Sequence, residues 1–546
     1  MAESPEHTEE YKEPTNFNAR PETNGDVEGR DHGILVKANP LSRELQGRHM
    51  QMIAIGGAIG AGLFVGSGGA LESGGPASLV LGYIIVGSML LCTVQALGEL
   101  AVLFPVNGAF FTYIVRFVDP SLGFAVGWDY AIGWLTVLPF ELTAAGITIR
   151  FWRDDLNVGI WIAVFLFLLC VIQIFGVRGY GEVEFILSTI KIMGCIGFII
   201  LAIVIDCGGV GNQGYLGAKY WHNPGAFNNG FRGFCSVFVV AAFAFGGTEL
   251  VGLAAAEAAN PRKSLPQATK QVFWRITLFY VLSLFLLGLI VPYTNPNLLN
   301  STGANSKYSP FVIAIRLAGI KALPSIFNVI ITVSVISVAN SCTFGSTRTM
   351  QALAERGMAP AFLATVDKHG RPIWGVAIQL AFGLLAFIGE AKSESTVFDW
   401  LLSLSGLSYF FVWGCICLAH IRFRSAWKAQ GHVKAELPYE AIFGVVGSWY
   451  GFALNIICMI ATFYTALYPV GASPQAGAFF QTYLAGPIIV ALYVGWKLYS
   501  RIWTWYVPAH EMDITSGRRS LELDPDDMPP KKTWKNAPMR VVRALF

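Results

Sequence analysis

Apolar residues run through most of this chain in segments of about 20 residues, separated by short polar stretches. A helix needs about 20 predominantly apolar residues to cross a bilayer. The pattern therefore predicts an all-α polytopic membrane protein with about twelve transmembrane helices. The predicted spans lie at about 50–71, 77–103, 122–149, 158–177, 184–206, 233–256, 273–293, 324–347, 374–390, 398–421, 446–468 and 480–500.

The amino-acid composition is that of a membrane protein, and it bears on which partners to expect. The 546 residues are 54% hydrophobic and 13% charged, whereas soluble domains have about 25% charged residues. A net charge of +3 gives no reason to expect nucleic acid, and the lipid bilayer becomes the expected surroundings. The nine cysteines stand singly and show no metal-ligand spacing, so no metal, cofactor or enzymatic activity is expected.

The two ends of the chain differ from the apolar region between them. Residues 1–46 are rich in Glu, Pro, Asn and Gly and lack an apolar period, which predicts a disordered tail. Residues 47–500 form the predicted transporter domain. Residues 501–546 begin with interfacial aromatic residues and continue with acidic and basic patches, which suits a tail read by sorting or ubiquitination machinery.

Positive charge is concentrated on one side of the predicted membrane domain. The loops after the sixth, eighth and tenth spans are richer in Lys and Arg than the loops between them. Cytoplasmic loops carry such an excess, so both termini are expected in the cytoplasm. The cations counted are Arg262, Lys263, Lys270, Arg275, Arg356, Lys368, Arg371, Arg422, Arg424, Lys428 and Lys434.

The first span, IAIGGAIGAGLFVGSG at 53–68, holds six glycines in sixteen residues. Each glycine costs a helix about 1 kcal/mol relative to alanine, so an unbroken helix is not expected. Broken helices are tolerated in a bilayer where their free backbone groups line a cavity. Carbonyls near Ala58 and N–H groups near Ala61 would suit an ammonium beside a carboxylate, as in an amino acid. The alternative is that the glycines serve close helix packing.

The sixth span is also interrupted near its middle, at Gly246 and Gly247, with Glu249 close behind. Two interrupted helices at corresponding positions indicate an inverted-repeat transporter with its site at the membrane midplane. The repeats would cover about 50–206 and 233–421, and the helices at about 446–500 would be additions. Helices 1 and 6 would be discontinuous.

Four polar residues inside the spans are candidates for chemistry. Glu141 follows Pro139 in the third span, and Glu249 follows the glycine pair of the sixth. Lys191 either extends to the membrane edge or projects inward as a fixed charge near the first span. Ser341 either bonds substrate or joins neighbouring helices. Carboxylates at this depth are rare and usually functional, and each could carry a coupled proton.

Several long motifs occur in order between about residues 45 and 520. They are QMIAIGGAIGAGLFVGSG, QALGELAVLFPVNGAFFTY, LPFELTAAGITI, FAFGGTELVGLAAAEAANPRKSLPQA and NSCTFGSTRTMQALAERGMAPAFLATVDKHGRP. This set resembles the amino acid–polyamine–organocation superfamily and, within it, the fungal general amino acid permeases. The resemblance implies a leucine-transporter-like fold of five plus five helices. It also implies proton-driven import of amino acids at the plasma membrane by alternating access.

The resemblance also places family roles on residues of this chain. It implies that the backbone around the Gly-Ala-Gly motif takes the substrate carboxylate, and that carbonyls near the two breaks take the ammonium. It gives Lys191 the place of a bound sodium ion, and it matches Glu249 and Glu141 to family glutamates at the same spans. The implied substrate-binding residues are Ala58, Gly60, Ala61, Gly62, Glu141, Phe243, Gly246 and Ser341.

The motif departs from many relatives at Ala61, where a Ser or Thr hydroxyl is common, so substrate preference is left open. A permease selective for proline or for basic amino acids would share nearly every motif. An amino-acid-sensing transceptor is a further alternative. A channel would need a ring of filter groups, and nothing in the chain repeats in that way.

Overall fold

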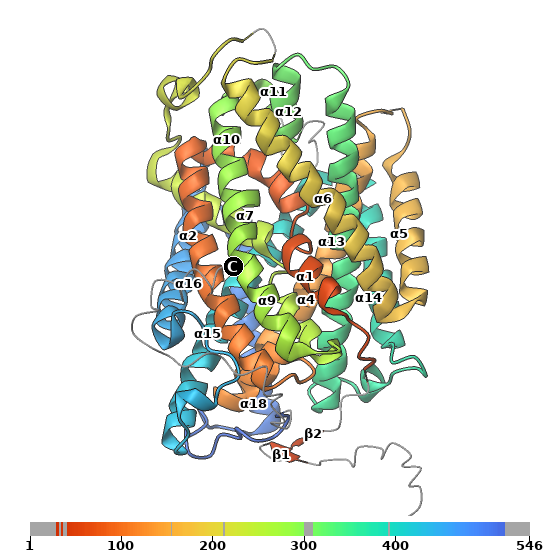
Figure 1. The fold of residues 1–546 in the computed structure, drawn as a ribbon, viewed down its shortest axis with the longest axis vertical. Helices are drawn as coiled ribbons and strands as arrows, with labels where there is room; N and C mark the ends of the chain where they lie inside the picture. The colour runs from red at the N-terminus through yellow and green to blue at the C-terminus, as the bar shows by residue number, and fades with distance from the viewer. Residues whose placement is uncertain are drawn as a thin grey trace, which may run out of the picture.

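The computed structural model describes residues 29–31, 34–36, 41–153, 155–210, 213–299, 309–390 and 394–518. This part is mostly helical, apart from a short antiparallel pair of strands, β1 (Gly29–Asp31) and β2 (Ile34–Val36). Most of the predicted N-terminal tail lies outside the described residues. The described part of the chain is therefore almost entirely helical (Figure 1).

The helices follow one another along the chain with short connections. Their bounds are α1 (Gly47–Gly56), η1 (Gly62–Gly66), α2 (Ser67–Leu103), α3 (Ala109–Phe117), α4 (Pro120–Ile149), α5 (Val158–Ile174), α6 (Gly176–Asp206), η2 (Trp221–Gly225), α7 (Gly230–Phe245), α8 (Leu250–Leu253), η3 (Ala254–Glu257), α9 (Pro261–Trp274), η4 (Arg275–Leu282), α10 (Ser283–Ile290), α11 (Pro296–Leu299), α12 (Pro310–Leu317), α13 (Leu323–Glu355), η5 (Ala361–Ala364), α14 (Ile373–Gly383), η6 (Leu384–Glu390), α15 (Glu394–Ala429), η7 (Lys434–Glu436), α16 (Gly444–Leu467), α17 (Ala476–Tyr483) and α18 (Ala485–Ser500).

Eight helical segments within the described residues are long and apolar enough to cross a membrane. The other predicted spans fall on shorter apolar helices, such as Val158–Ile174 and Ile373–Ile388, or on helices in two pieces. The first and second spans meet at Gly75, whose φ of 80° turns the backbone between them. A side chain there would meet the Ala226 carbonyl at 2.9 Å, so the turn has room only for glycine.

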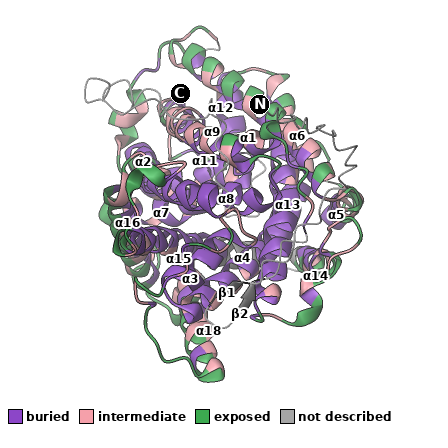
Figure 2. Ribbon diagram, turned by 60° about the horizontal axis from the view of Figure 1, so that its bottom comes forward, coloured by how far each residue is buried: buried purple, intermediate pink, exposed green. Residues whose placement is uncertain are grey.

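Burial separates central helices from peripheral ones (Figure 2). The most apolar stretch is 94% buried in Gly230–Glu257 and 89% buried in Pro120–Ile149, but only 33% buried in Gly444–Leu467. The peripheral helices carry exposed apolar side chains such as Phe167, Met193 and Val446. Because lipid tails are as apolar as these side chains, this outer surface suits a bilayer.

Both predicted helix breaks are present. α1 ends at Gly56, the backbone from Gly57 to Gly60 is not helical, and helix resumes at Ala61. α7 ends at Phe245, a turn follows from Gly246 to Glu249, and α8 starts at Leu250. Gly247 has a φ of 92°, which is open to glycine and strained for other residues. The glycine-rich sequences therefore end these helices inside the membrane domain, as predicted.

The described part of the C-terminal region packs against the helices. The N–H of Val507 donates to the Val118 carbonyl at 2.9 Å, and Arg116 donates to the Ser516 carbonyl at 2.8 Å. Met512 and Ile514 are buried. We call residues 501–518 the C-terminal strap; its apolar residues account for this docking, which the sequence pattern of a free tail did not predict.

Candidate functional site

The two helix breaks lie against each other. A Cβ added at Gly62 would lie 2.5 Å from the Ala244 Cα, so the two backbones are in contact there. The Tyr280 hydroxyl lies 3.0 Å from the Ala58 carbonyl oxygen and 2.8 Å from the Ala244 carbonyl oxygen. One buried tyrosine of η4 therefore joins both breaks. The close packing of Gly62 supports the packing interpretation of that glycine.

Arg275 is a second link between the breaks, and its position corrects a prediction. Its guanidinium donates to the Ala54 carbonyl at 2.6 Å and to the Thr248 hydroxyl, and it is fully buried. The prediction that Arg275 is a cation of a cytoplasmic loop is therefore wrong. Carbonyls at the C-terminal end of a helix carry partial negative charge, so a cation beside the end of α1 is stabilised.

The carboxylate of Glu141 faces the first break. It lies on α4, is 1% exposed, and its Oε1 would be 3.6 Å from a Cβ added at Gly60. The N–H of Ala61 points towards it. Within the described residues, neither carboxylate oxygen accepts a hydrogen bond of ordinary geometry. The structure thus brings Glu141, Gly60 and Ala61 together.

Lys191 projects inward. It is fully buried on α6, and its ammonium lies 3.3 Å from Glu184 and 2.7 Å from the Ser337 hydroxyl. The alternative in which it extends to the membrane edge is therefore wrong. An electrostatic interaction also connects Lys191 with Glu141. Glu184 was not among the predicted site residues, although its spacing of seven residues from Lys191 places both on one helix face.

Glu249 is held by several donors at the second break. The Tyr130 hydroxyl donates to it at 2.9 Å, the Gly247 N–H at 3.2 Å and the Trp413 indole N–H at 3.2 Å. The carboxylate is fully buried. Since its oxygens are occupied by donors from three segments, Glu249 also ties the sixth span to α4 and α15.

The remaining predicted residues divide between the site and its surroundings. Phe243 packs edge-to-face on Phe140, with ring centroids 4.9 Å apart, beside the second break. Gly246 faces the Tyr409 ring, which a Cβ would meet at 2.3 Å. Ser341 instead contacts the Tyr180 hydroxyl at 3.3 Å, so it joins α13 to α6, the alternative role considered for it.

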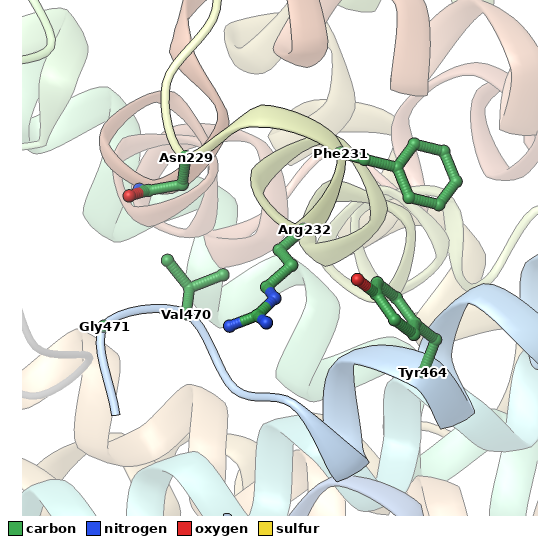
Figure 3. Close-up of a pocket in the computed structure, with 6 residues that line it drawn as sticks. All are labelled: Asn229, Phe231, Arg232, Tyr464, Val470 and Gly471. Atoms are coloured by element: carbon green, nitrogen blue, oxygen red, sulfur yellow. The ribbon is translucent and has the colours of Figure 1, made fainter. Parts of the chain in front are cut away.

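A surface cavity lies far from this centre. It has a volume of about 370 Å³ and is lined by Asn229, Phe231, Arg232, Tyr464, Val470 and Gly471. Figure 3 shows the Arg232 side chain extending between Val470 and Tyr464. The cavity sits at the start of α7, and the break follows the end of that helix, roughly 20 Å further on at 1.5 Å per residue. It is therefore distinct from the site formed by the breaks.

A second group of buried residues joins α13 to η3 and α6. Arg348 of α13 pairs with Glu257 of η3 at 2.8 Å, and both side chains are buried. The Tyr180 and Phe344 rings stack beside them with centroids 4.6 Å apart. A small pocket adjoins Tyr180, Phe344 and Arg348 between α6 and α13.

A polytopic helical membrane protein whose two interrupted helices meet beside buried carboxylates belongs, as a class, with the solute carriers. The sequence comparisons make this specific: the model of the amino acid permease family matches residues 49–506, and the chain belongs to that family. It is therefore a transporter and not an enzyme.

Three curated relatives illustrate the similarity. The general amino-acid permease GAP1 of Saccharomyces cerevisiae is 52% identical, over 90% of this chain and 83% of that protein. The general amino-acid permease GAP2 of Candida albicans is 52% identical, over 90% and 84%. The cationic amino acid transporter 1 of Schizosaccharomyces pombe is 50% identical, over 91% and 85%.

Proposed function

We propose that this chain imports amino acids across the plasma membrane together with protons, by alternating access. The observation that carries the proposal is the Glu141 carboxylate facing Gly60 and Ala61 at the first break. Two charged carboxylates placed against the same break repel each other. We infer that Glu141 carries a proton when an amino acid carboxylate binds at this break.

The substrate would lie between the two breaks. Backbone N–H groups of Gly60, Ala61 and Gly62 would hold its carboxylate, and carbonyls of Ala58, Phe243 and Gly246 would hold its ammonium. Partial charges at the ends of half-helices favour this orientation. The Ala58 carbonyl already accepts from Tyr280, and its second lone pair leaves room for one more donor.

Three residues are candidates for the coupled proton: Glu141, Glu249 and Lys191. Glu249 accepts three hydrogen bonds and Lys191 is paired with Glu184, whereas Glu141 faces the substrate position directly. We therefore place the proton on Glu141. Lys191 would serve as the fixed charge in place of a sodium ion, which makes transport sodium-independent.

The surrounding architecture is part of the proposal. Twelve spans in a leucine-transporter-like arrangement, with repeats at about 50–206 and 233–421 and cytoplasmic termini, fit the two breaks and their order in the chain. Even when Arg275 is not counted, the loops after the sixth, eighth and tenth spans remain richer in Lys and Arg than the loops between them. Tails at 1–46 and 501–546 would meet sorting or ubiquitination machinery.

The test is uptake in permease-deficient fungal cells expressing the chain. Labelled neutral, basic and acidic amino acids are supplied at external pH 5 and pH 7, with sodium or choline as the main cation. We expect accumulation against the gradient, more at pH 5 than at pH 7, and no effect of sodium. Uptake that only equilibrates, or that needs sodium, would contradict the proposal.

The same experiment tests narrower functions. The relatives include general permeases and a protein named a cationic amino acid transporter. They therefore support two substrate ranges for this chain: a broad range, and a narrower range of cationic amino acids. Competition by all three substrate groups supports the broad range. Competition by basic amino acids or proline alone supports a selective permease. A response without accumulation supports a transceptor.

A further inference from the structure

A buried polar cluster centred on Glu184 lies beside the proposed site. The Glu184 side chain is fully buried on α6. It accepts from Ser188 at 2.7 Å, from the Lys191 ammonium at 3.3 Å and from Ser337 of α13 at 2.6 Å. Lys191 also donates to Ser337 at 2.7 Å, which closes the cluster across two helices.

This region contains two carboxylates but one ammonium group. Lys191 is shared between Glu184, which it contacts, and Glu141, with which it interacts electrostatically. With all three groups ionised, two negative charges face one positive charge, and an amino acid zwitterion leaves that balance unchanged. Buried charges without compensation are strongly destabilising. One added proton brings the balance to zero.

We propose that Glu184 is a positioning residue of the transport cycle: it holds Lys191 as its counter-ion, so that Glu141 requires a proton for its own neutralisation. The inference rests on the proposed function, because it assumes that Glu141 shares the substrate position. In this proposal, Glu184 is the reason that one proton accompanies each amino acid. Without Glu184, Lys191 would neutralise Glu141 instead.

Other ionisable groups facing the cluster have partners of their own. Arg348 is held by Glu257 at 2.8 Å, and Nε2 of His49 on α1 lies 3.3 Å from Glu182. Among the described residues, Lys191 is the cation in contact with Glu184. α5 contributes only Cys170 and α10 has no ionisable side chain. The further ionisable groups on the packed elements include Tyr180 and Cys195 of α6, Cys342 of α13, and Arg275 and Tyr280 of η4.

The test is the pH profile of uptake in Glu184→Gln. The lone charge of Lys191 then favours the Glu141 carboxylate, so the external pH for half-maximal uptake should fall by about one unit or more. Glu184→Asp keeps the charge and should keep the wild-type midpoint. Glu182→Gln, on the same helix but 40% exposed, is the matched control and should leave the midpoint unchanged.

A double variant separates charge balance from simple packing. Glu184→Gln with Lys191→Gln removes both charges. Loss of the fixed charge of Lys191 lowers the rate of uptake, but we expect the pH midpoint of the remaining uptake to return to the wild-type value. If Glu184→Gln fails to reach the cell surface, recovery of surface expression in the double variant supports the same conclusion. An unchanged midpoint in Glu184→Gln, or a double variant whose midpoint stays at that of Glu184→Gln, overturns the inference. Wild-type uptake that ignores pH would instead defeat the proposed function.

Discussion

The Tyr280 hydroxyl lies 3.0 Å from the Ala58 carbonyl oxygen, where the first helix is interrupted, and the same hydroxyl reaches the carbonyl of Ala244 before the second interruption. A single side chain thus fixes the distance between two segments that are about 190 residues apart in the chain. If these segments move together during transport, this contact should matter for rate as well as for stability.

Tyr280→Phe keeps the ring and removes the donor to both carbonyls. A net hydrogen bond contributes about 1 kcal/mol, so we expect uptake to fall by roughly fivefold or more. Labelled amino acid uptake, corrected for surface expression, measures the effect. Tyr83→Phe is the control, because Tyr83 is equally buried but its hydroxyl lacks a hydrogen-bond partner among the described residues. Equal uptake in the two variants would contradict the expectation.

Arg275 connects Ala54 with Thr248 through two different nitrogens. Lysine carries one ammonium on a flexible stem and cannot reproduce this fork. We therefore expect Arg275→Lys to lose most uptake and to lower the unfolding temperature of the purified protein. Lys263→Met, an exposed cation of the adjoining α9, should change neither measurement. Normal uptake in Arg275→Lys would show that a single charge is enough.

Glu141→Gln and Glu249→Gln should fail in different ways. Gln at 141 resembles a protonated carboxyl, so exchange of bound amino acid should persist while proton-driven accumulation is lost. Gln at 249 turns its NH₂ group towards another donor, either Trp413 or Gly247. The lost hydrogen bond leaves buried donors unpaired at a cost of about 1–3 kcal/mol in stability, so exchange should fall as well. Counterflow and accumulation, measured on both variants, distinguish them. Accumulation in Glu141→Gln would move the proton to Glu249 or Lys191.

Gly62→Ala tests close packing at the breaks. The added Cβ would lie 2.5 Å from Ala244 Cα, a backbone atom that cannot move aside cheaply. We expect lower thermal stability and little protein at the cell surface. Gly69→Ala, in the next helix, has nothing within 4 Å of its Cβ and should be neutral or stabilising by up to about 1 kcal/mol. Full stability in Gly62→Ala would require the two breaks to separate in the membrane.

The C-terminal strap should stay docked in mildly acidic conditions. Burial raises the pKa of the Asp513 carboxyl, but hydrogen bonds from Ser516 and Thr515 and the charge of Arg116 outweigh burial and lower it to about 2. Because this pKa is lowered in the docked form, the ionised carboxyl stabilises docking at pH values above its ordinary pKa of about 4. That stabilisation is lost as the pH falls towards 2. Protection of the strap from protease should therefore not change between pH 7 and pH 5.

A variant pair checks the contribution of that carboxylate. Asp513→Asn should expose the strap to protease at pH 7, because the charge opposite Arg116 is removed. Glu511→Gln replaces a nearby carboxylate whose side chain is 58% exposed, and it should leave protection unchanged. Equal protection in both variants would show that the apolar residues Met512 and Ile514 alone hold the strap.

The sequence by itself determined the class of fold and the two interruptions. Apolar segments of membrane length require helices, and glycines at Gly56–Gly62 and Gly246–Gly247 weaken those helices in a way that depends only on the local backbone. The buried charges of Glu141 and Glu249 were also readable, since carboxylates are rare in apolar segments.

Only the tertiary structure decided which residues share a partner. Arg275 ends a basic stretch, and this pattern predicts a loop cation. The direction of its side chain, however, depends on where η4 packs against the two breaks. Glu184 lies in a segment with other charged residues, and nothing in its spacing shows that Ser337 closes the cluster from α13. Hydrogen bonds between residues 146 and 221 positions apart depend on helix packing, whereas a sequence period describes one helix at a time.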